Sequence, residues 1–299
     1  MDLSGFCVND GGMHSGCHIH WVSGKGGVGK STFSYLLAQE FADKGERSLV
    51  VEIGDRSFFS YALGQDFQYQ EKKVEENVFL AHWHWQECLL EYILHFVKLP
   101  SLANLFFSNS IMKNITAVAP GIAEISILGK LTSGIRNVGP EFQWDHIILD
   151  AHSTGHSKSY LLAPAALHDS IGIGPLGQHA KGIDEVLRKQ DRISYYLVTL
   201  PEDLPTIESL EFQSDMRDLM GIDFQIILNQ YFHTSYFENV ESLAPDFASY
   251  VKAKQEKQEK ALVALANTGI QRKLAFLGRK GDYSEWIRRL REKSSDLVG

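Results

Sequence analysis

The stretch GKGGVGKST at residues 24–32 stands between an apolar run, HIHWV at 18–22, and FSYLLAQEFADKG at 33–45. It fits the pattern GxxxxGK[ST], and the strand, glycine-rich loop and helix follow in the order that this pattern requires. The alternative, a glycine-rich turn that matches by chance, does not explain the flanking strand and helix. The predicted phosphate-binding residues are Gly24, Lys25, Gly26, Gly27, Val28, Gly29, Lys30, Ser31 and Thr32.

The residue types in this loop suit a phosphate chain. Glycines let several backbone N–H groups converge on phosphate oxygens without Cβ clashes, and the helix N-terminus adds partial positive charge. We expect Lys30 to reach the β- and γ-phosphates and Ser31 to bind Mg²⁺.

Strand-like and helix-like segments alternate outward from the loop, which predicts an α/β fold with a doubly wound, mostly parallel sheet. The predicted strands are 18–22, 48–53, 77–83, 146–151, 170–174, 194–200 and 223–229, and the predicted helices are 30–44, 86–98, 120–135, 178–190, 205–219, 236–266 and 283–293. We expect an N-terminal extension at 1–17 and one domain at 18–299, with a helical insertion at about 86–135.

The composition is that of a globular protein: of 299 residues, 44% are hydrophobic and 22% charged, with a net charge of -8. Residues 249–299 carry 12 basic and 6 acidic side chains, so the rest is strongly acidic, which disfavours general nucleic-acid binding. Apolar runs are too short to cross a membrane, and the N-terminus does not resemble a secretory signal. Three cysteines without a CxxC pair argue against a disulfide framework. We therefore expect a cytoplasmic protein.

Lys25 is the unusual residue of the loop, because a simple phosphate-binding loop needs no cation there, and from the residues alone it could be an ordinary surface lysine. The loop is similar to the deviant Walker A motif of the family that includes MinD, ParA, the nitrogenase iron protein and the ArsA-type ATPases. This resemblance implies ATP as substrate, Mg²⁺ as cofactor, and a homodimer in which Lys25 reaches the partner's nucleotide.

Two further segments resemble the ArsA and tail-anchored-protein targeting branch. In LVVEIGDRSFFSYALG, Asp55 matches the family's aspartate after the second strand, which would orient the attacking water and contribute to the metal site; a turn aspartate is the alternative. Arg56 stands where the family usually has proline. In HIILDAHSTGHSKSYLLAP, at 146–164, Asp150 would bind Mg²⁺ through water, and Gly155 and His156 would form a γ-phosphate switch.

The third matching segment is VTLPEDLPTIESLEFQSDMRDLMGIDFQIILNQY. It implies that Asn229 contacts adenine, whereas an asparagine after a strand is otherwise usually a cap or turn residue. The loop KLAFLGRKG at 273–281 lacks the proline expected on the adenine side. The resemblance spans about residues 18 to 281.

In the same branch, helices inserted at this place hold either apolar client segments or metalloid-binding cysteines. Only Cys88 lies in the insertion, so arsenite capture by several thiolates is not expected. The candidate client groove consists of Leu90, Ile93, Phe96, Val97 and Phe106, with packing against the sheet as the alternative. The terminal helix at 283–293 could lie on a membrane surface, but docking on the sheet is the favoured interpretation. The shared dimer zinc of the targeting factors uses a CxxC that this chain lacks.

The function expected from the sequence is a homodimeric Mg-ATP hydrolase of the ArsA type that acts on a client or partner protein. The alternative is a slow or inactive nucleotide-gated module that positions a partner at a membrane or other surface.

Overall fold

A computed structural model describes residues 17–97, 121–138, 143–172, 174–232, 244–266, 268–278 and 281–295, with the backbone but not the side chains at 95–97. The strands are β1 (His18–Gly24), β2 (Ser48–Ile53), β3 (Lys72–Glu75), β4 (Val78–Trp83), β5 (His146–Asp150), β6 (Ile193–Thr199), β7 (Gln225–Tyr231) and β8 (Ile270–Ala275). They form one sheet in the order β3-β4-β2-β5-β1-β6-β7-β8, and among these described strands only the β3–β4 pair is antiparallel. The predicted fold class is confirmed.

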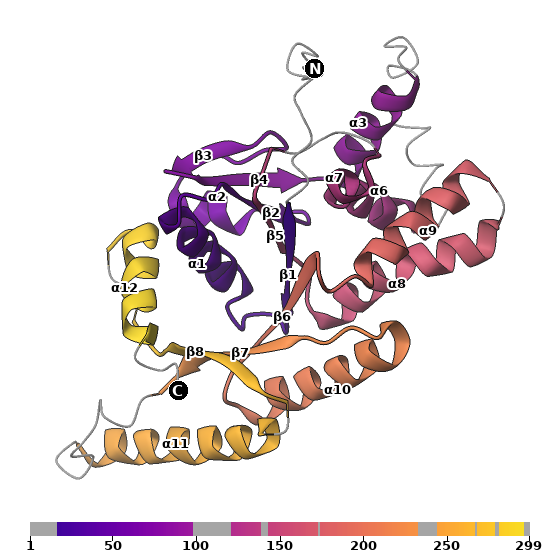
Figure 1. The fold of residues 1–299 in the computed structure, drawn as a ribbon. Helices are drawn as coiled ribbons and strands as arrows, with labels where there is room; N and C mark the ends of the chain where they lie inside the picture. Colours follow the sequence, from indigo (N-terminus) through magenta and orange to yellow (C-terminus); the bar gives the residue numbers. More distant parts are fainter. Residues whose placement is uncertain are drawn as a thin grey trace.

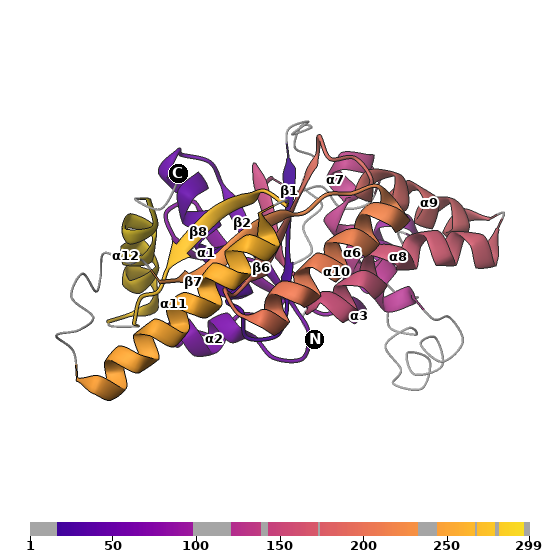
Figure 2. The same cartoon turned by 90° about the horizontal axis from the view of Figure 1, so that it is seen from below.

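Helices cover both faces of the sheet (Figure 1). Their bounds are α1 (Lys30–Asp43), α2 (Phe58–Leu63), α3 (Trp85–Val97), α6 (Ile122–Leu131), α7 (Ser133–Arg136), α8 (Thr154–Ile171), α9 (Pro175–Leu187), α10 (Asp203–Met220), α11 (Pro245–Leu265) and α12 (Tyr283–Ser295). One hydrophobic cluster packs α1, α2 and α12 on the sheet, and a second packs α6, α8, α9 and α10 on the opposite face. Figure 2 shows these two helical layers with the strands between them.

The alternation of side chains along the central strands explains the two clusters. Ile19 and Trp21 of β1 lie in one cluster and Val22 lies in the other, and all three are fully buried. Because successive side chains of a strand point to opposite faces, a continuously apolar strand must be covered on both sides.

The predicted strand at 170–174 is wrong. Residues 154–171 form α8, whose buried Leu161, Pro164 and Leu167 share one face, and Gly172 ends the helix with φ +65°. Ile171 is 43% exposed on the helix surface and is not paired in the sheet. A short apolar run containing isoleucine does not distinguish a strand from the last turn of a buried helix.

Two strands and two helices differ from the prediction. β3 is a short antiparallel edge strand, and β8 is an edge strand with a polar sequence, IQRKLA. The sequence predicted neither α2, which has six residues, nor α8, which has 18.

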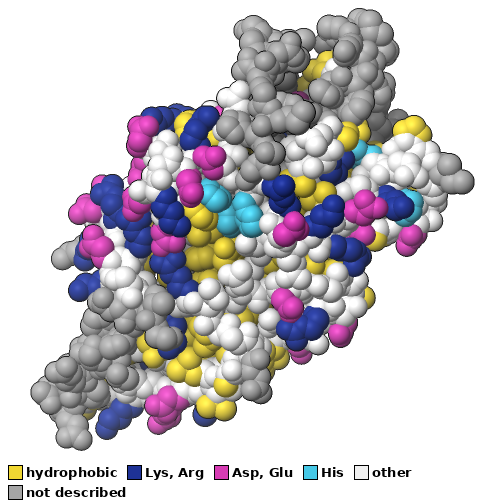
Figure 3. All heavy atoms as spheres, viewed as in Figure 1, with side chains coloured by type: hydrophobic (Ala, Val, Ile, Leu, Met, Phe, Trp, Pro, Cys, Tyr) yellow, Lys and Arg dark blue, Asp and Glu magenta, His cyan; other side chains and the backbone are white. Residues whose placement is uncertain are grey.

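Several histidine side chains gather on one face of the molecule (Figure 3). His18 and His146 begin β1 and β5, at the ends of these strands opposite the glycine-rich loop. His20 Nε2 lies 3.0 Å from His146 Nδ1, and His146 Nε2 lies 3.0 Å from a carboxylate oxygen of Glu46. The pKa values of His20 and His146 are both lowered, and burial is the largest cause. This hydrogen-bonded chain joins β1 to β5 at the far end of β1 from the glycine-rich loop.

Candidate functional site

The glycine-rich loop of the motif at 24–32, called the phosphate loop below, connects the end of β1 to the start of α1. It requires glycine at two positions. Gly24 has φ +151°, and a Cβ there would lie 2.2 Å from the carbonyl oxygen of Val198 on β6. Gly29, the N-cap of α1, has φ +96°, and a Cβ there would lie 2.2 Å from the side-chain nitrogen of Asn229. These glycines let the loop lie directly against the ends of β6 and β7.

Parallel pairing of β1 with β5 brings the loop next to Asp150. Val22 is in register with Asp150, and Ala151 N donates to Val22 O at 2.9 Å. Consequently Ser31 at the start of α1 reaches Asp150: its hydroxyl donates to Asp150 Oδ2 at 2.5 Å. Lys30 Nζ donates to the carbonyl oxygen of Lys25 at 3.2 Å, across the loop.

Asp150 is buried, and an ionised carboxylate in a buried position needs a nearby cation. Burial raises the pKa of Asp150 to about 7, whereas the Ser31 hydrogen bond and the Lys30 charge lower it and Glu52 raises it further. Its Oδ1 is buried without a hydrogen-bond partner. A buried orphan carboxylate oxygen beside a serine hydroxyl is a suitable donor set for Mg²⁺, which prefers oxygen ligands and usually keeps several waters. Ser31 and Asp150 therefore fit the implied ion.

Asp55 follows β2 at the same edge of the sheet and is exposed. The turn that carries it is held by Glu52, whose Oε1 accepts from Phe58 N at 2.7 Å, and Ser57 also donates to this carboxylate. Burial raises the pKa of Glu52, and these hydrogen bonds lower it. No sequence motif marks Glu52, although an acid before a serine-started helix could have suggested a cap.

Histidines flank the Asp55 turn on both sides. His82 Nε2 is hydrogen-bonded to Gly54 O at 2.8 Å, and a Cβ on Gly54 would lie 3.2 Å from the ring of His152. Burial lowers the pKa of His84 and of His152, and the charge of Asp55 opposes this in both. Among the described residues no group of three His, Cys, Asp or Glu side chains could hold a metal ion.

Gly155 and His156 lie in the first turn of α8 and are exposed. The rings of His152 and His156 are 5.8 Å apart. The same turn is anchored to the sheet, because Trp21 Nε1 on β1 donates to Ser157 Oγ at 2.9 Å. The residues after β5 therefore lie beside β1, the strand that leads into the phosphate loop.

Lys25 is held at the rim of the site by its own chain. Its Nζ donates to Glu208 Oε1 on α10 at 2.6 Å, and each of the two side chains is about one-third exposed or more. Exposed ion pairs of this kind contribute about 0 to 1 kcal/mol, so the contact is readily broken.

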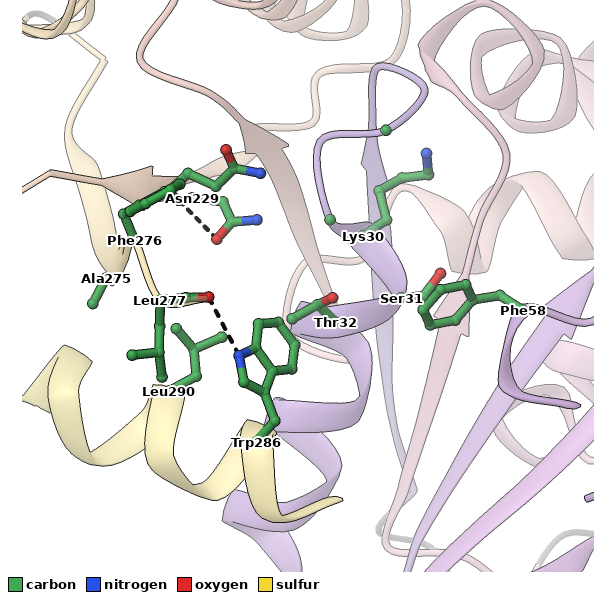
Figure 4. Close-up of a pocket in the computed structure, with 13 residues that line it drawn as sticks. Lys30, Ser31, Thr32, Phe58, Asn229, Ala275, Phe276, Leu277, Trp286 and Leu290 are labelled. Atoms are coloured by element: carbon green, nitrogen blue, oxygen red, sulfur yellow. Dashed lines mark hydrogen bonds between the residues drawn. The ribbon is translucent and has the colours of Figure 1, made fainter. Parts of the chain in front are cut away.

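A cavity of about 410 Å³ begins at the phosphate loop and continues toward the C-terminal elements (Figure 4). Its lining residues are Gly27, Gly29, Lys30, Ser31, Thr32, Phe58, Asn229, Gln230, Ala275, Phe276, Leu277, Trp286 and Leu290. Asn229, expected at the base, lies in this lining, with Nδ2 donating to Val28 O and Oδ1 accepting from Gln230 N, both at 2.8 Å. Phe276 and Leu277 lie in the loop at 273–281 that the resemblance placed on the adenine side, although the sequence assigned no contact to either, and no motif marks Trp286 as a lining residue.

Leu90 and Ile93, the described side chains of the predicted client groove, are not among the residues that line this cavity. Leu90 is buried, with 3% of its surface exposed, and Ile93 is half-buried. Phe106 and the side chains of Phe96 and Val97 lie outside the described residues. The apolar face of α12 is buried through Tyr283, Ile287 and Leu290, in agreement with docking on the fold. None of the described helices is long and apolar enough to span a bilayer.

The family model and the relatives that match this chain are all described as ATPases. Residues 17–174 match the family model described as anion-transporting ATPase. The chain is 30% identical over 226 residues to ATPase BagA of Mycobacterium tuberculosis, an alignment that covers 72% of this chain and 66% of that protein. It is 26% identical over 197 residues to the arsenical pump-driving ATPase of Escherichia coli, covering 65% of this chain and 31% of that protein. The chain therefore spans just under two thirds of the mycobacterial relative.

Proposed function

Because this chain belongs to the anion-transporting ATPase (ArsA-type) family, we propose that it binds ATP with Mg²⁺ and hydrolyses it as a homodimer whose closed state depends on the nucleotide. The reaction is attack of water on the γ-phosphorus, cleavage of its bond to the β–γ bridging oxygen, and release of ADP and phosphate. The output of the cycle is a conformational change that acts on a partner protein.

The observation that carries this proposal is the division of labour between the two loop lysines. Lys30 lines the cavity and is half-buried, and burial lowers the pKa of its ammonium while Asp150 raises it. Lys25 is not among the residues that line the cavity and instead reaches outward to Glu208. A cation at the rim is suitably placed to act on a nucleotide held by a second copy of the chain.

The remaining residues have roles that follow from their positions. The loop amides and Lys30 bind the phosphates, and Ser31 and Asp150 hold Mg²⁺, which neutralises charge on the β- and γ-phosphates when bound. Asp55, exposed at the carboxyl end of β2, orients the attacking water and takes up its proton. Gly155 and His156 respond to the γ-phosphate at the start of α8.

We also propose that the partner is a protein with an apolar segment, and that it binds the helices between β4 and β5. The family resemblance supports this assignment. Buried Leu90 belongs to the packing of α3, so the contact surface would involve other residues of 86–135. The alternative function, positioning at a membrane through α12, is disfavoured by the burial of Ile287 and Leu290.

The solution mass of an Asp55→Asn protein, measured with and without Mg-ATP, tests the proposal. Asp55→Asn should block hydrolysis and trap the closed state, so ATP should convert a monomer to a dimer. The matched control is Asp55→Asn combined with Lys25→Ala, which should bind ATP and remain monomeric. If the mass of Asp55→Asn does not respond to bound ATP, the dimer mechanism is wrong for this chain, and Lys25 is an ordinary surface lysine.

A further inference from the structure

Beyond the phosphate loop and the start of α1, the cavity wall is formed mainly by C-terminal elements, of which Asn229 adjoins the loop. Asn229 and Gln230 come from β7, Phe276 and Leu277 follow β8, and Trp286 comes from α12. In Figure 4 the amide of Asn229 and the indole of Trp286 border the same open space, with Thr32 of α1 beside it. Among the described residues, this part of the lining is aromatic, aliphatic and amide, and it contains no charged side chain.

The indole of Trp286 is held in one orientation. Its Nε1 donates to Leu277 O at 3.3 Å, and its ring lies 5.8 Å from that of Tyr283 at an interplanar angle of 38°. Because the polar atom of the indole is bonded to the backbone, the part of the ring that lines the cavity is apolar. A fixed, half-buried aromatic ring of this kind suits a flat ring of a ligand.

α12 is anchored to the elements that carry the phosphate loop. Tyr283 Oη donates to Oγ1 of Thr32, the residue that follows Ser31, at 3.4 Å. Ala275 N donates to Ser294 Oγ at 2.9 Å, and Arg291 pairs with Asp43 of α1 at 2.7 Å. Trp286 is therefore positioned relative to both ends of the cavity.

We propose that Trp286 is the stacking platform for the purine ring of the bound nucleotide, so that α12 forms one wall of the nucleotide site. This inference rests on the proposed function, because it assumes that the phosphates occupy the loop. With the phosphates at Lys30, the base extends toward α12, where the amides of Asn229 and Gln230 can contact its edge. Phe276 is the competing platform, since it lines the same space and is 45% exposed.

Titration calorimetry with two ligands tests the assignment: ATP, and inorganic tripolyphosphate, which has the phosphates without the base. Stacking of one base on one aromatic ring corresponds to roughly 5- to 150-fold in affinity. Trp286→Ala should raise the Kd of ATP by about tenfold or more and leave that of tripolyphosphate unchanged, and Trp286→Phe should retain most of the ATP affinity. Phe276→Leu should have a smaller effect than Trp286→Ala.

Tryptophan fluorescence gives a second readout that does not require a disruptive variant. ATP should change the emission of the natural protein and of the control Trp85→Phe, whereas Trp286→Phe should lose most of this change. Trp85 lies at the start of α3 and does not line the cavity.

The outcomes separate the two proposals. If the natural protein binds ATP and both Trp286→Phe and Trp286→Ala bind it about as tightly, or if Trp286→Ala weakens ATP and tripolyphosphate equally, the stacking role is wrong and the proposed function stands. A larger loss with Phe276→Leu would assign the platform to Phe276 instead. If the natural protein binds neither ligand, the proposed function is wrong and the stacking role fails with it.

Discussion

Replacing Asp150 by asparagine should stabilise the nucleotide-free protein at neutral and alkaline pH. Burial raises the pKa of this carboxyl from its ordinary value of 3.8 to about 7. The folded chain therefore binds the proton more tightly than the unfolded chain. The resulting stabilisation is fully present below about pH 4 and is lost as the pH rises through about 7.

The magnitude follows from the shift. About three pKa units at ~1.4 kcal/mol each correspond to a cost of roughly 4 kcal/mol for keeping Asp150 ionised in the folded protein at about pH 8. Asparagine has nearly the same shape, can still accept the Ser31 hydrogen bond, and carries no charge. We expect Asp150→Asn to exceed the natural protein in unfolding free energy by a few kcal/mol at about pH 8 and to match it near about pH 4.

Urea unfolding with a chelator present, at several pH values between about 4 and 8, measures this difference. Asp169→Asn, at an exposed position near the end of α8, is the control and should change neither the stability nor its pH dependence. Mg-ATP should then stabilise the natural protein and stabilise Asp150→Asn much less. Equal unfolding free energies of Asp150→Asn and the natural protein at alkaline pH would refute the argument that a buried, uncompensated carboxylate occupies this position.

Three other changes have definite expected results. Glu208→Gln removes the ion pair that holds Lys25, so it should favour ATP-dependent dimerisation by up to about fivefold, because exposed pairs are worth about 0.2–1 kcal/mol. Sedimentation of the Asp55→Asn background with and without Glu208→Gln would measure this, and an unchanged or weaker dimer would contradict it. Gly29→Ala places a Cβ 2.2 Å from the Asn229 amide at φ +96°, so it should lower both thermal stability and ATP affinity, whereas Gly26→Ala, where a Cβ meets nothing within 4 Å, should be much milder. Equal effects of the two substitutions in calorimetry would count against a close contact between the loop and β7. Burial lowers the pKa of His152 from its ordinary value of 6.5, so the folded protein resists protonation of this ring and loses stability as the pH falls below that value. His152→Ala should flatten the unfolding free energy over this acidic range, and an unchanged slope would show that His152 does not titrate in this way.

The arrangement of residues around the glycine-rich loop could be predicted from the sequence because its determinants are local. Gly24 to Thr32 form a contiguous motif, and the hydrogen bond between Ser31 and Asp150 follows from two strands that end at the same sheet edge. The central strands β1, β2 and β5 are buried almost throughout and most of their residues are apolar, so their pattern is readily recognised. The strand predicted at 170–174 was wrong because the same residue types complete the last turn of α8.

Edge elements were missed for a different physical reason. β8 lies at one edge of the described sheet, beside β7, so its residues need not be apolar, and Gln271 and Lys273 are as typical of a loop as of a strand. The partner of Lys25 was also unpredictable: Glu208 is 183 residues away, and only the packing of α10 beside β6 brings it near the loop. Such contacts depend on tertiary structure and leave no mark in a local pattern.

The two halves of the cavity differ in how many side-chain substitutions would preserve their chemistry. The match to the family model covers residues 17–174. It therefore includes the loop, Asp55 and Asp150, but it ends before Asn229 and Trp286, which line the cavity. Under the proposed function, the phosphate half must present backbone amides and a lysine in fixed positions, so few substitutions preserve its chemistry. The base half needs only a flat apolar wall and an amide, and many side chains can supply these. Selectivity among nucleotide bases in this chain should accordingly be set by β7, β8 and α12, and substitutions there should change base preference while leaving the binding of tripolyphosphate intact.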